Sequence, residues 1–307
     1  MMKYDLAASL RCVALSAAWI VVLELFAKLL FSHAVRKVTV QEADMRYVHL
    51  YFTCIKRSMI SRLEYKKDTI VALFSFFFSN FCSLTAIYFI LQAIPALAGY
   101  SLYEVGFFYG FSMLPIALDH LFSDELWLVA YRRVTDGDMD MHFLRPVPVL
   151  FQVFAETFQP EGFGELILGA ALIVICASNL TVAVTFGSVA VLFVGALFGA
   201  VIITSLKVAI AALAFIFKRS GPLLQIIYNF STYAKYPLAI YPAFIRAFLI
   251  FVLPFGLFIS LPVDTLLYGK HDPWLLCGAI IGCAAVFFAL AVWVWTACER
   301  RYESTGS

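Results

Sequence analysis

Long apolar runs, separated by short charged segments, dominate this sequence of 307 residues. Each has the roughly 20 residues that a helix needs to cross a bilayer. The runs span residues 69–94, 102–122, 166–186, 189–217 and 274–297. Hydrophobic residues make up 63% of the chain and its mean hydropathy is +0.90, outside the range of soluble domains. A helix satisfies its own backbone groups in lipid, so the pattern predicts an all-α polytopic membrane protein.

The remaining composition excludes several classes of function. Lys and Arg punctuate the apolar runs instead of forming a concentrated basic face, so we expect no nucleic-acid partner. The seven cysteines are scattered without a Cys-x-x-Cys pair, and we interpret them as packing residues. No Gly-x-x-x-x-Gly-Lys-Ser/Thr loop occurs, and Gly162-Phe-Gly164 is an isolated fragment of a dinucleotide fingerprint. We therefore expect this chain itself to bind neither ATP nor another cofactor.

The first 68 residues fall into two segments. Residues 1–44 contain an apolar stretch that charged residues interrupt. It is a candidate extra hydrophobic helix, a signal-like segment, or an extension upstream of a core that begins at Met45. Residues 45–68 interleave basic side chains with an apolar stripe at helical spacing. This pattern predicts an amphipathic helix in the headgroup plane on the cytoplasmic side, with a solvated cytoplasmic helix as the alternative.

One strongly polar segment, residues 134–152, separates two apolar runs, and we call it the polar island. Its turn around Gly137 and its bend at Pro146 must lie outside the hydrocarbon, because lipid cannot satisfy unpaired backbone groups. Three arginines flank it or lie within it: Arg132, Arg133 and Arg145. The connections on either side, 92–103 and 182–188, contain no Lys or Arg. The positive-inside rule therefore predicts a cytoplasmic polar island.

Local signals predict a short helix on each side of the turn in the polar island. The first covers about 124–135, with Ser123 as its cap, acidic residues in its first turn and Gly137 just past its end. The second begins at Pro148 and ends before Pro160. The polar island is therefore expected to be a compact, partly helical connection.

Residues 221–269 fit two topologies. In the first, residues 222–236 form a short outward span, and the proline-rich run after it folds as broken helices that dip back from the outer face. In the second, residues 243–263 form the span, which suits Lys235 and Arg246 better under the positive-inside rule. Both topologies predict a cytoplasmic C-terminus.

Few charged side chains lie inside the apolar runs, and they are the candidates for chemistry. Asp119 beside His120 is by default a relay candidate. Their position near the inner interface favours a different interpretation, in which they are hydrated or paired with Arg132 or Arg133. Lys207 lies late in its run, where its long side chain is expected to reach the interface.

The polar island also contains an arrangement that resembles a metal site. Asp138, Asp140 and His142 alternate, as ligands can, but on a flexible turn such spacing is more typical of solvated polarity. No Ser/His/Asp set and no His-Glu-x-x-His motif is present. We therefore predict no metal site and no catalytic residues.

Three Gly-x-x-x-Gly motifs occur inside the apolar runs: Gly106–Gly110, Gly195–Gly199 and Gly278–Gly282. Small residues four apart let helix backbones approach closely in lipid, where packing drives association. Packing within the chain is the favoured interpretation, and contact with a partner subunit is the alternative for at least one motif.

Five short segments carry a family resemblance. They are Gly137-Asp-Met-Asp140 with Leu144-Arg145-Pro146, Leu150-Phe-Gln-Val, Tyr236-Pro-Leu-Ala-Ile-Tyr-Pro242, Phe251-Val-Leu-Pro254 and Arg301-Tyr-Glu-Ser-Thr-Gly306. Together they resemble the ABC-2 family of transporter permeases. The resemblance covers about residues 45–307 and leaves residues 1–44 outside it.

The resemblance implies a permease subunit in the bacterial inner (plasma) membrane, with six transmembrane helices of the ABC-2 exporter type in residues 69–307. It implies two protein partners besides membrane lipid: a second permease subunit, identical or a paralogue, and a separate cytoplasmic ATPase that binds ATP and usually drives export. By position, residues 237–265 would form a broken re-entrant segment near the outer face, which favours the first topology. The ATPase-coupling loop would contain Arg132, Arg133, Gly137, Asp140, Leu144, Arg145 and Pro146.

Two other functions stay open on the sequence. An ATP-independent channel or ion-coupled carrier needs charged groups deep in the spans, and Asp119 and Lys207 are the candidates. An intramembrane lipid-modifying enzyme would depend on Asp119 with His120. Apolar and aromatic walls suit a lipid, peptide or drug as substrate, but most membrane proteins share such walls, so the sequence does not specify the substrate.

Overall fold

The structure is a computed structural model of the chain. It describes residues 43–64, scattered positions between 70 and 89, and residues 99–304 apart from 157 and 183. In this described part helices dominate and no strand occurs, which confirms the all-α prediction. The predicted N-terminal extension, except its last two residues, and much of the predicted span over 69–94 lie outside the described residues.

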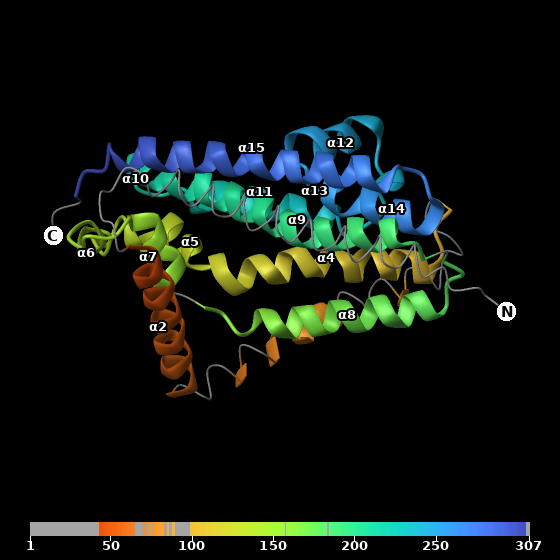
Figure 1. The fold of residues 1–307 in the computed structure, drawn as a ribbon, viewed down its shortest axis with the longest axis horizontal. Helices are drawn as coiled ribbons and strands as arrows, with labels where there is room; N and C mark the ends of the chain where they lie inside the picture. The colour runs from red at the N-terminus through yellow and green to blue at the C-terminus, as the bar shows by residue number, and fades with distance from the viewer. Residues whose placement is uncertain are drawn as a thin grey trace. The chain divides into compact units, whose positions relative to one another are not determined.

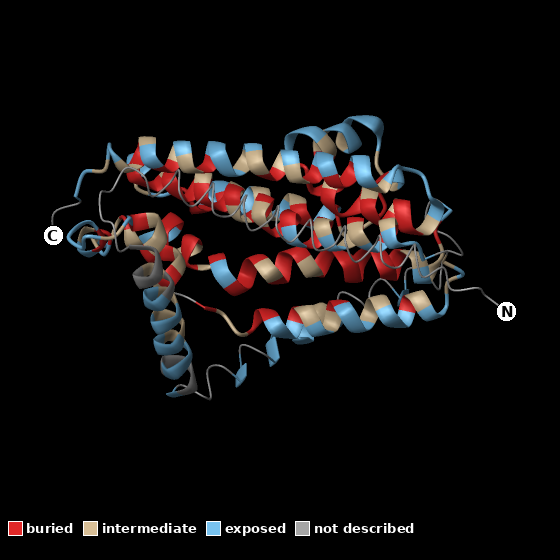
Figure 2. Ribbon diagram, in the orientation of Figure 1, coloured by how far each residue is buried: buried red, intermediate tan, exposed pale blue. Residues whose placement is uncertain are grey.

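Four long helices lie side by side in the order α8, α4, α9, α15 (Figure 1). Their bounds are Gly162–Ser178 for α8, Leu102–Ser123 for α4, Phe186–Ala212 for α9 and Pro273–Glu299 for α15. Buried residues line α4 and the sides of α9 that face its neighbours, whereas the outer sides of α8 and α15 are largely exposed (Figure 2). An apolar exposed face is what a helix presents to lipid.

Glycine residues permit the closest helix contacts. A Cβ on Gly110 of α4 would lie 3.0 Å from the carbonyl oxygen of Gly169 of α8, and the motif Gly195–Gly199 of α9 approaches Phe258 as closely. These contacts confirm packing within the chain for two of the three motifs. The motif Gly278–Gly282 of α15 differs, because no atom of the described part of the chain lies within 4 Å of a Cβ built on either glycine.

Three helices of the described part are long and apolar enough to cross a membrane: α4, α9 with its continuation α10 (Ala214–Phe217), and α15. A bent pair of helical segments, 243–252 and 255–268, adds a fourth if it counts as one span. α8 has 17 residues, short of the roughly 20 that a span needs, because residues 179–182, 184 and 185 of the predicted span are not helical. The protein is thus a multi-pass membrane protein, and six spans stay a prediction.

Residues 221–269 fold as broken helices. α11 (Gly221–Tyr233) leads through the 3-10 turn η2 (Leu238–Ile240) to α12 (Ala243–Ala247), the π-helical turn η3 (Phe248–Val252), α13 (Phe255–Phe258) and α14 (Ser260–Tyr268). The chain bends by 80° between η3 and α13, at Pro254, whose missing N–H cannot continue a helix. This agrees with the broken helices of the first predicted topology, and a straight span over 243–263 does not form.

A helix is present in the region of the amphipathic helix predicted for residues 45–68: α2 (Ala43–Glu64). From Tyr51 onward, one side of it contacts the rest of the chain: the Tyr51 ring lies 6.3 Å from that of Phe151, and the backbone N–H of Phe158 donates to the hydroxyl of Ser58. The apolar side chains of Phe52 and Met59 are exposed. That the exposed side meets lipid headgroups stays a prediction.

Candidate functional site

The polar island is a turn between short helices. α5 (Glu125–Leu128) continues into the π-helical turn η1 (Val129–Arg133), as predicted for about 124–135, and α7 (Val149–Glu156) is the second predicted helix. Between them, Gly137 has a φ of +79°, the left-handed conformation that glycine adopts without strain. The four-residue helix α6 (Asp140–Phe143) follows this turn.

Ion pairs hold the polar island together, with Arg133 at their centre. Its guanidinium binds the carboxylates of Glu125 and Glu156, the second at 2.8 Å. His142 Nε2 lies 3.0 Å from the Glu156 carboxylate, and Arg145 binds the same carboxylate at 3.0 Å. One glutamate at the end of α7 therefore ties together the end of η1, the helix α6 and the bend before Pro146.

The charge of Glu156 is stabilised by its partners. Burial alone would raise its pKa, but hydrogen bonds from His142 and Arg133 and their charges outweigh burial and hold the pKa at about 2. Gln152 adds two hydrogen bonds, from its Nε2 to the backbone carbonyl oxygens of His142 (2.8 Å) and Val147 (2.7 Å). The turn is therefore braced by charged and neutral contacts together.

Asp140 has different partners. Its carboxylate accepts hydrogen bonds from Tyr302 Oη (2.7 Å) and Ser304 Oγ (2.6 Å), and the Phe143 ring stacks on the Tyr302 ring at 4.7 Å. The hydrogen bonds from Ser304 and Tyr302 lower the pKa of Asp140. Asp138 is exposed, and His142 contacts Glu156. Asp140 and His142 therefore bind separate partners, Asp138 is exposed, and the three side chains do not converge as metal ligands.

The predicted coupling residues divide into two groups. Arg133, Gly137 and Asp140 lie within the braced turn. Arg132, Leu144, Arg145 and Pro146 are exposed, and so is the neighbouring Met141, which was not among the predicted residues. Leu144 is 84% exposed and Met141 is 62% exposed. Of these, Met141 carried no signal in the sequence that marked it as a surface residue.

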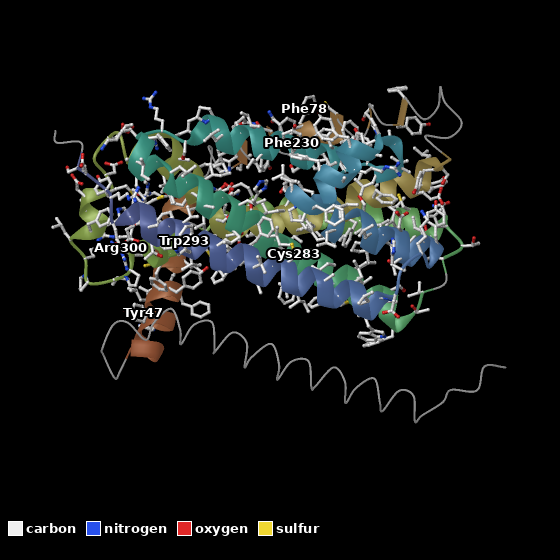
Figure 3. The ribbon with its side chains drawn as sticks, turned by 90° about the horizontal axis from the view of Figure 1, so that it is seen from above. Tyr47, Phe78, Phe230, Cys283, Trp293 and Arg300 are labelled. Atoms are coloured by element: carbon white, nitrogen blue, oxygen red, sulfur yellow. The ribbon has the colours of Figure 1, made fainter. Side chains whose placement is uncertain are left out.

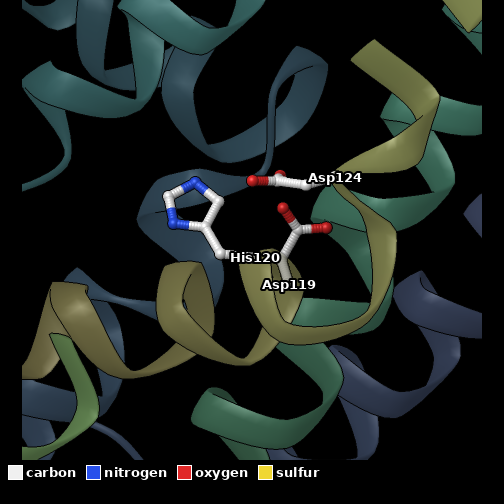
Figure 4. Close-up of side chains that lie close together, drawn as sticks. All are labelled: Asp119, His120 and Asp124. Carbon is white, nitrogen blue, oxygen red and sulfur yellow. The ribbon is translucent and has the colours of Figure 1, made fainter. Parts of the chain in front are cut away.

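Buried charges occur where the polar island meets the helix bundle (Figure 4). Asp119 and His120 are only 1% and 6% exposed, so the predicted hydration of this pair is wrong. Asp119 Oδ2 lies 2.5 Å from Lys207 Nζ of α9, in place of the predicted arginine partners. Lys207 is 2% exposed and also binds Asp124 at 2.7 Å, so the prediction that it reaches the interface is wrong too.

His120 belongs to a second buried set. Its Nδ1 lies 2.7 Å from a carboxylate oxygen of Glu165 in α8, and its Nε2 lies 2.7 Å from Tyr228 Oη in α11. Neither partner was predicted from the sequence. Glu165 immediately precedes an apolar run, and Tyr228 is one tyrosine among 15, so neither was distinguishable before the helices were brought together.

Asp119, His120 and Asp124 place one possible ligand atom each within 4.8 Å of one another (Figure 4). The ammonium group of Lys207 already binds both carboxylates, and both imidazole nitrogens of His120 have partners. Ser123, the predicted helix cap, donates its hydroxyl hydrogen to Asp119 instead, and α5 has no side-chain cap. We assign the cluster to ion pairing between helices, since burying charges requires such partners.

Comparison with known protein families identifies a match over most of the chain. A family model described as ABC-2 family transporter protein matches residues 69–306, which include the polar island, the broken helices and the segment after α15. No curated protein and no solved structure matches the chain significantly.

Proposed function

From the premise that this chain belongs to the ABC-2 family of transporter proteins and is a permease of an ABC transporter, we propose that it forms half of a dimeric substrate path and that a separate cytoplasmic ATPase drives it. The ATPase docks on the exposed side chains of the polar island. Two observations together support this proposal. The apolar side chain of Leu144 is exposed, and ion pairs of Glu156 with Arg133 and Arg145 hold the turn that presents it.

Charge asymmetry between the two ends of the bundle supports a cytoplasmic polar island. Contacts join the segments at this end: Lys218 Nζ donates to the backbone carbonyl of Glu303, and the Ser220 N–H donates to that of Ala130. Basic residues gather there: Arg132, Arg133, Arg145, Lys218, Arg219, Arg300 and Arg301. Figure 3 labels Arg300 at this end of α15. Within the described residues, the loops at the opposite end (99–101, 179–185 and 269–272) contain Lys270 alone. Under the positive-inside rule, the basic end is cytoplasmic.

The braced turn suits the transmission of force. A membrane domain without a nucleotide site does work only if the conformational change of another chain reaches it through a contact. A loose loop would absorb such a movement, whereas the Glu156 contacts make the turn move with α5 and α7. The exposed Met141 and Leu144 give the partner an apolar anchor, and the neighbouring arginines give charge complementarity.

The second permease subunit is proposed to pack on α15. Gly278 and Gly282 lie on one exposed face of this helix together with Leu275, Val286, Leu290 and Trp293. Among the residues that the structure describes, no side chain fills the space over the two glycines. In lipid, such small-residue gaps gain packing energy when another helix occupies them. From the family we also propose that the partner subunit is either a second copy of this chain or a paralogue, and that the transporter exports its substrate.

The docking proposal is tested with Leu144→Asp in the full-length chain. At 84% exposure the substitution leaves the fold unchanged, while an aspartate in an apolar anchor weakens docking. The ATPase recovered with the tagged wild-type chain is expected to be lost from the variant, together with stimulation of its ATP hydrolysis. The matched control is Val184→Asp, because Val184 is 69% exposed in the loop at the opposite end. Equal recovery of the ATPase with both variants would contradict docking at the polar island.

The ion-coupled carrier and the lipid-modifying enzyme gain no support from the geometry. Asp119 and Lys207, the candidate groups for ion coupling, bind each other. His120, the enzyme candidate, lies between Glu165 and Tyr228. These groups join neighbouring helices.

A further inference from the structure

We propose that residues Tyr302–Ser304 form a clasp that fixes the position of α6 and so presents the docking surface of the polar island to the ATPase. The proposal builds on the docking function inferred above. It gives a role to the segment Arg301-Tyr-Glu-Ser-Thr-Gly306, which the sequence singled out and which the docking surface itself does not include.

The first contact of the clasp is at Asp140, the first residue of α6. Tyr302 Oη donates to one carboxylate oxygen at 2.7 Å, and Ser304 Oγ donates to the other at 2.6 Å. Both oxygens of one carboxylate are thus held by two residues that lie 162 and 164 positions further along the chain. Hydrogen bonds to a charged acceptor are stronger than neutral ones, so this contact is the chief polar tie of α6 to the clasp.

The second contact is aromatic, at the other end of α6. The rings of Phe143 and Tyr302 stack with centroids 4.7 Å apart and an angle of 11° between their planes. The Tyr302 ring also lies edge-on to Phe215 of α10, at 5.6 Å, and Phe215 in turn packs on Trp295 of α15 at 5.1 Å. Phe215 and Trp295 are buried. The clasp therefore connects α6 to the packed core of the bundle.

The third contact fixes the clasp itself. Lys218 Nζ, at the end of α10, donates to the backbone carbonyl oxygen of Glu303 at 2.8 Å and lies 5.9 Å from the centre of the Tyr302 ring. The segment is consequently held at its backbone and at a side chain. It is a fixed support for α6.

α6 needs such support because it has only four residues. A helix of one turn is not stable alone, since nucleation fixes several residues for one hydrogen bond. The clasp holds Asp140 and Phe143, while Met141 and Leu144, which alternate with them along the turn, are exposed. Without the clasp, α6 would keep the contact of His142 with Glu156, but the orientation of the exposed Met141 and Leu144 toward the ATPase would vary more. We therefore expect the clasp to determine docking affinity.

The test uses the full-length protein with Tyr302→Phe and Ser304→Ala together. This variant removes both hydroxyl donors and keeps the aromatic stack. Its matched control is Glu303→Gln, whose side chain makes none of the three contacts. With the ATPase recovered from the wild-type complex as the probe, the dissociation constant is expected to rise about tenfold in the double variant, as two lost hydrogen bonds predict. The control is expected to bind as the wild type does.

Two further readouts separate positioning from general stabilisation. Excess ATPase is expected to restore the full rate of hydrolysis in the double variant, because only affinity has changed. Amide hydrogen exchange at residues 139–144 is expected to be faster in the variant chain alone. Adding Asp140→Ala to the double variant is expected to have no further effect on affinity, since the hydroxyl groups act through that carboxylate.

The outcomes distinguish this proposal from the one on which it builds. If the wild-type chain binds no ATPase, the docking function fails, whereas the exchange rates still report whether the clasp holds α6. If the ATPase binds the double variant with unchanged affinity while exchange is faster, the position of α6 does not determine docking and the proposal is wrong. Unchanged exchange at residues 139–144 would show that the clasp does not hold α6.

Discussion

The ammonium group of Lys207 lies 2.5 Å from the carboxylate of Asp119, and both side chains are buried between α9 and α4. Asp124 adds a second carboxylate to the same lysine at 2.7 Å. A buried ion pair contributes little net stability relative to apolar residues of the same size, but removing one partner leaves the other charge buried without compensation. The energetic consequence of mutation therefore depends on which groups remain.

Lys207→Met is expected to destabilise the protein by about 3–5 kcal/mol, because two carboxylates lose their buried partner. Combining it with Asp119→Asn and Asp124→Asn is expected to recover most of that loss, since no charge is then left unpaired. Thermal unfolding of the purified chain in detergent would measure both variants. Additive destabilisation in the triple variant would contradict the assignment of these residues as one ion-paired set.

The pH dependence of the polar island follows from Glu156. Its pKa falls from 4.5 in the unfolded chain to about 2 in the folded one, so its carboxylate binds protons more weakly when folded. The stability that it contributes is fully present above pH 4.5 and is lost as the pH falls toward about 2. Pepsin cleavage near the exposed Leu144 is expected to accelerate over that range.

Glu156→Gln is the control for the pepsin experiment. This variant lacks the titrating group, so we expect it to be cleaved quickly at every pH at which pepsin is active, with a flatter pH profile. A wild-type profile that matches the variant's would mean that Glu156 does not brace the turn.

Gly137→Ala is expected to destabilise the turn by about 1–2 kcal/mol, because its φ of +79° brings a Cβ close to the following carbonyl oxygen. Gly164→Ala in α8 is the comparison. Nothing lies within 4 Å of a Cβ at that position, and alanine is the better helix former by about 0.5–1 kcal/mol. Opposite changes in the unfolding temperature would support this account, and similar losses at both positions would refute it.

Gly282→Leu is expected to weaken pairing of permease subunits without unfolding the chain, because no described residue of this subunit lies within 4 Å of a Cβ at that position. Cross-linking in membranes would measure pairing. The comparison is Gly110→Leu, which collides with α8 and is expected to prevent folding. If the Gly282→Leu chain inserts correctly and still pairs normally, the subunits do not pair through this face of α15.

Local signals in the sequence predicted most of the elements that shape the polar island. Gly137, Pro148 and Pro160 restrict the backbone directly, so the helices on either side of the turn were predictable within a few residues. Proline also predicted the broken helices after α11. The end of α8 was not predictable, because the loop 179–185 is nearly as apolar as the helix before it.

The partners of the buried charges were beyond sequence reasoning. Asp119 and His120 lie close to the end of an apolar run, where hydration is the usual outcome, and their partners Lys207, Glu165 and Tyr228 lie far away in the chain. Only the packing of α4 against α8, α9 and α11 brings them together. The same is true of Asp140 and Tyr302, which each belong to a recognised segment without any local sign that they touch.

Asp124 lies between the end of α4 and the start of α5, and its carboxylate binds the ammonium group of Lys207 in α9. A hinge at this junction would separate Asp124 from Lys207, whose side chain is only 2% exposed and would lose one of its two carboxylate partners. Bending between α4 and α5 is consequently costly, so we expect this junction to be stiff although the chain changes direction there. We therefore expect a push on the polar island to tilt α4 and α9 together.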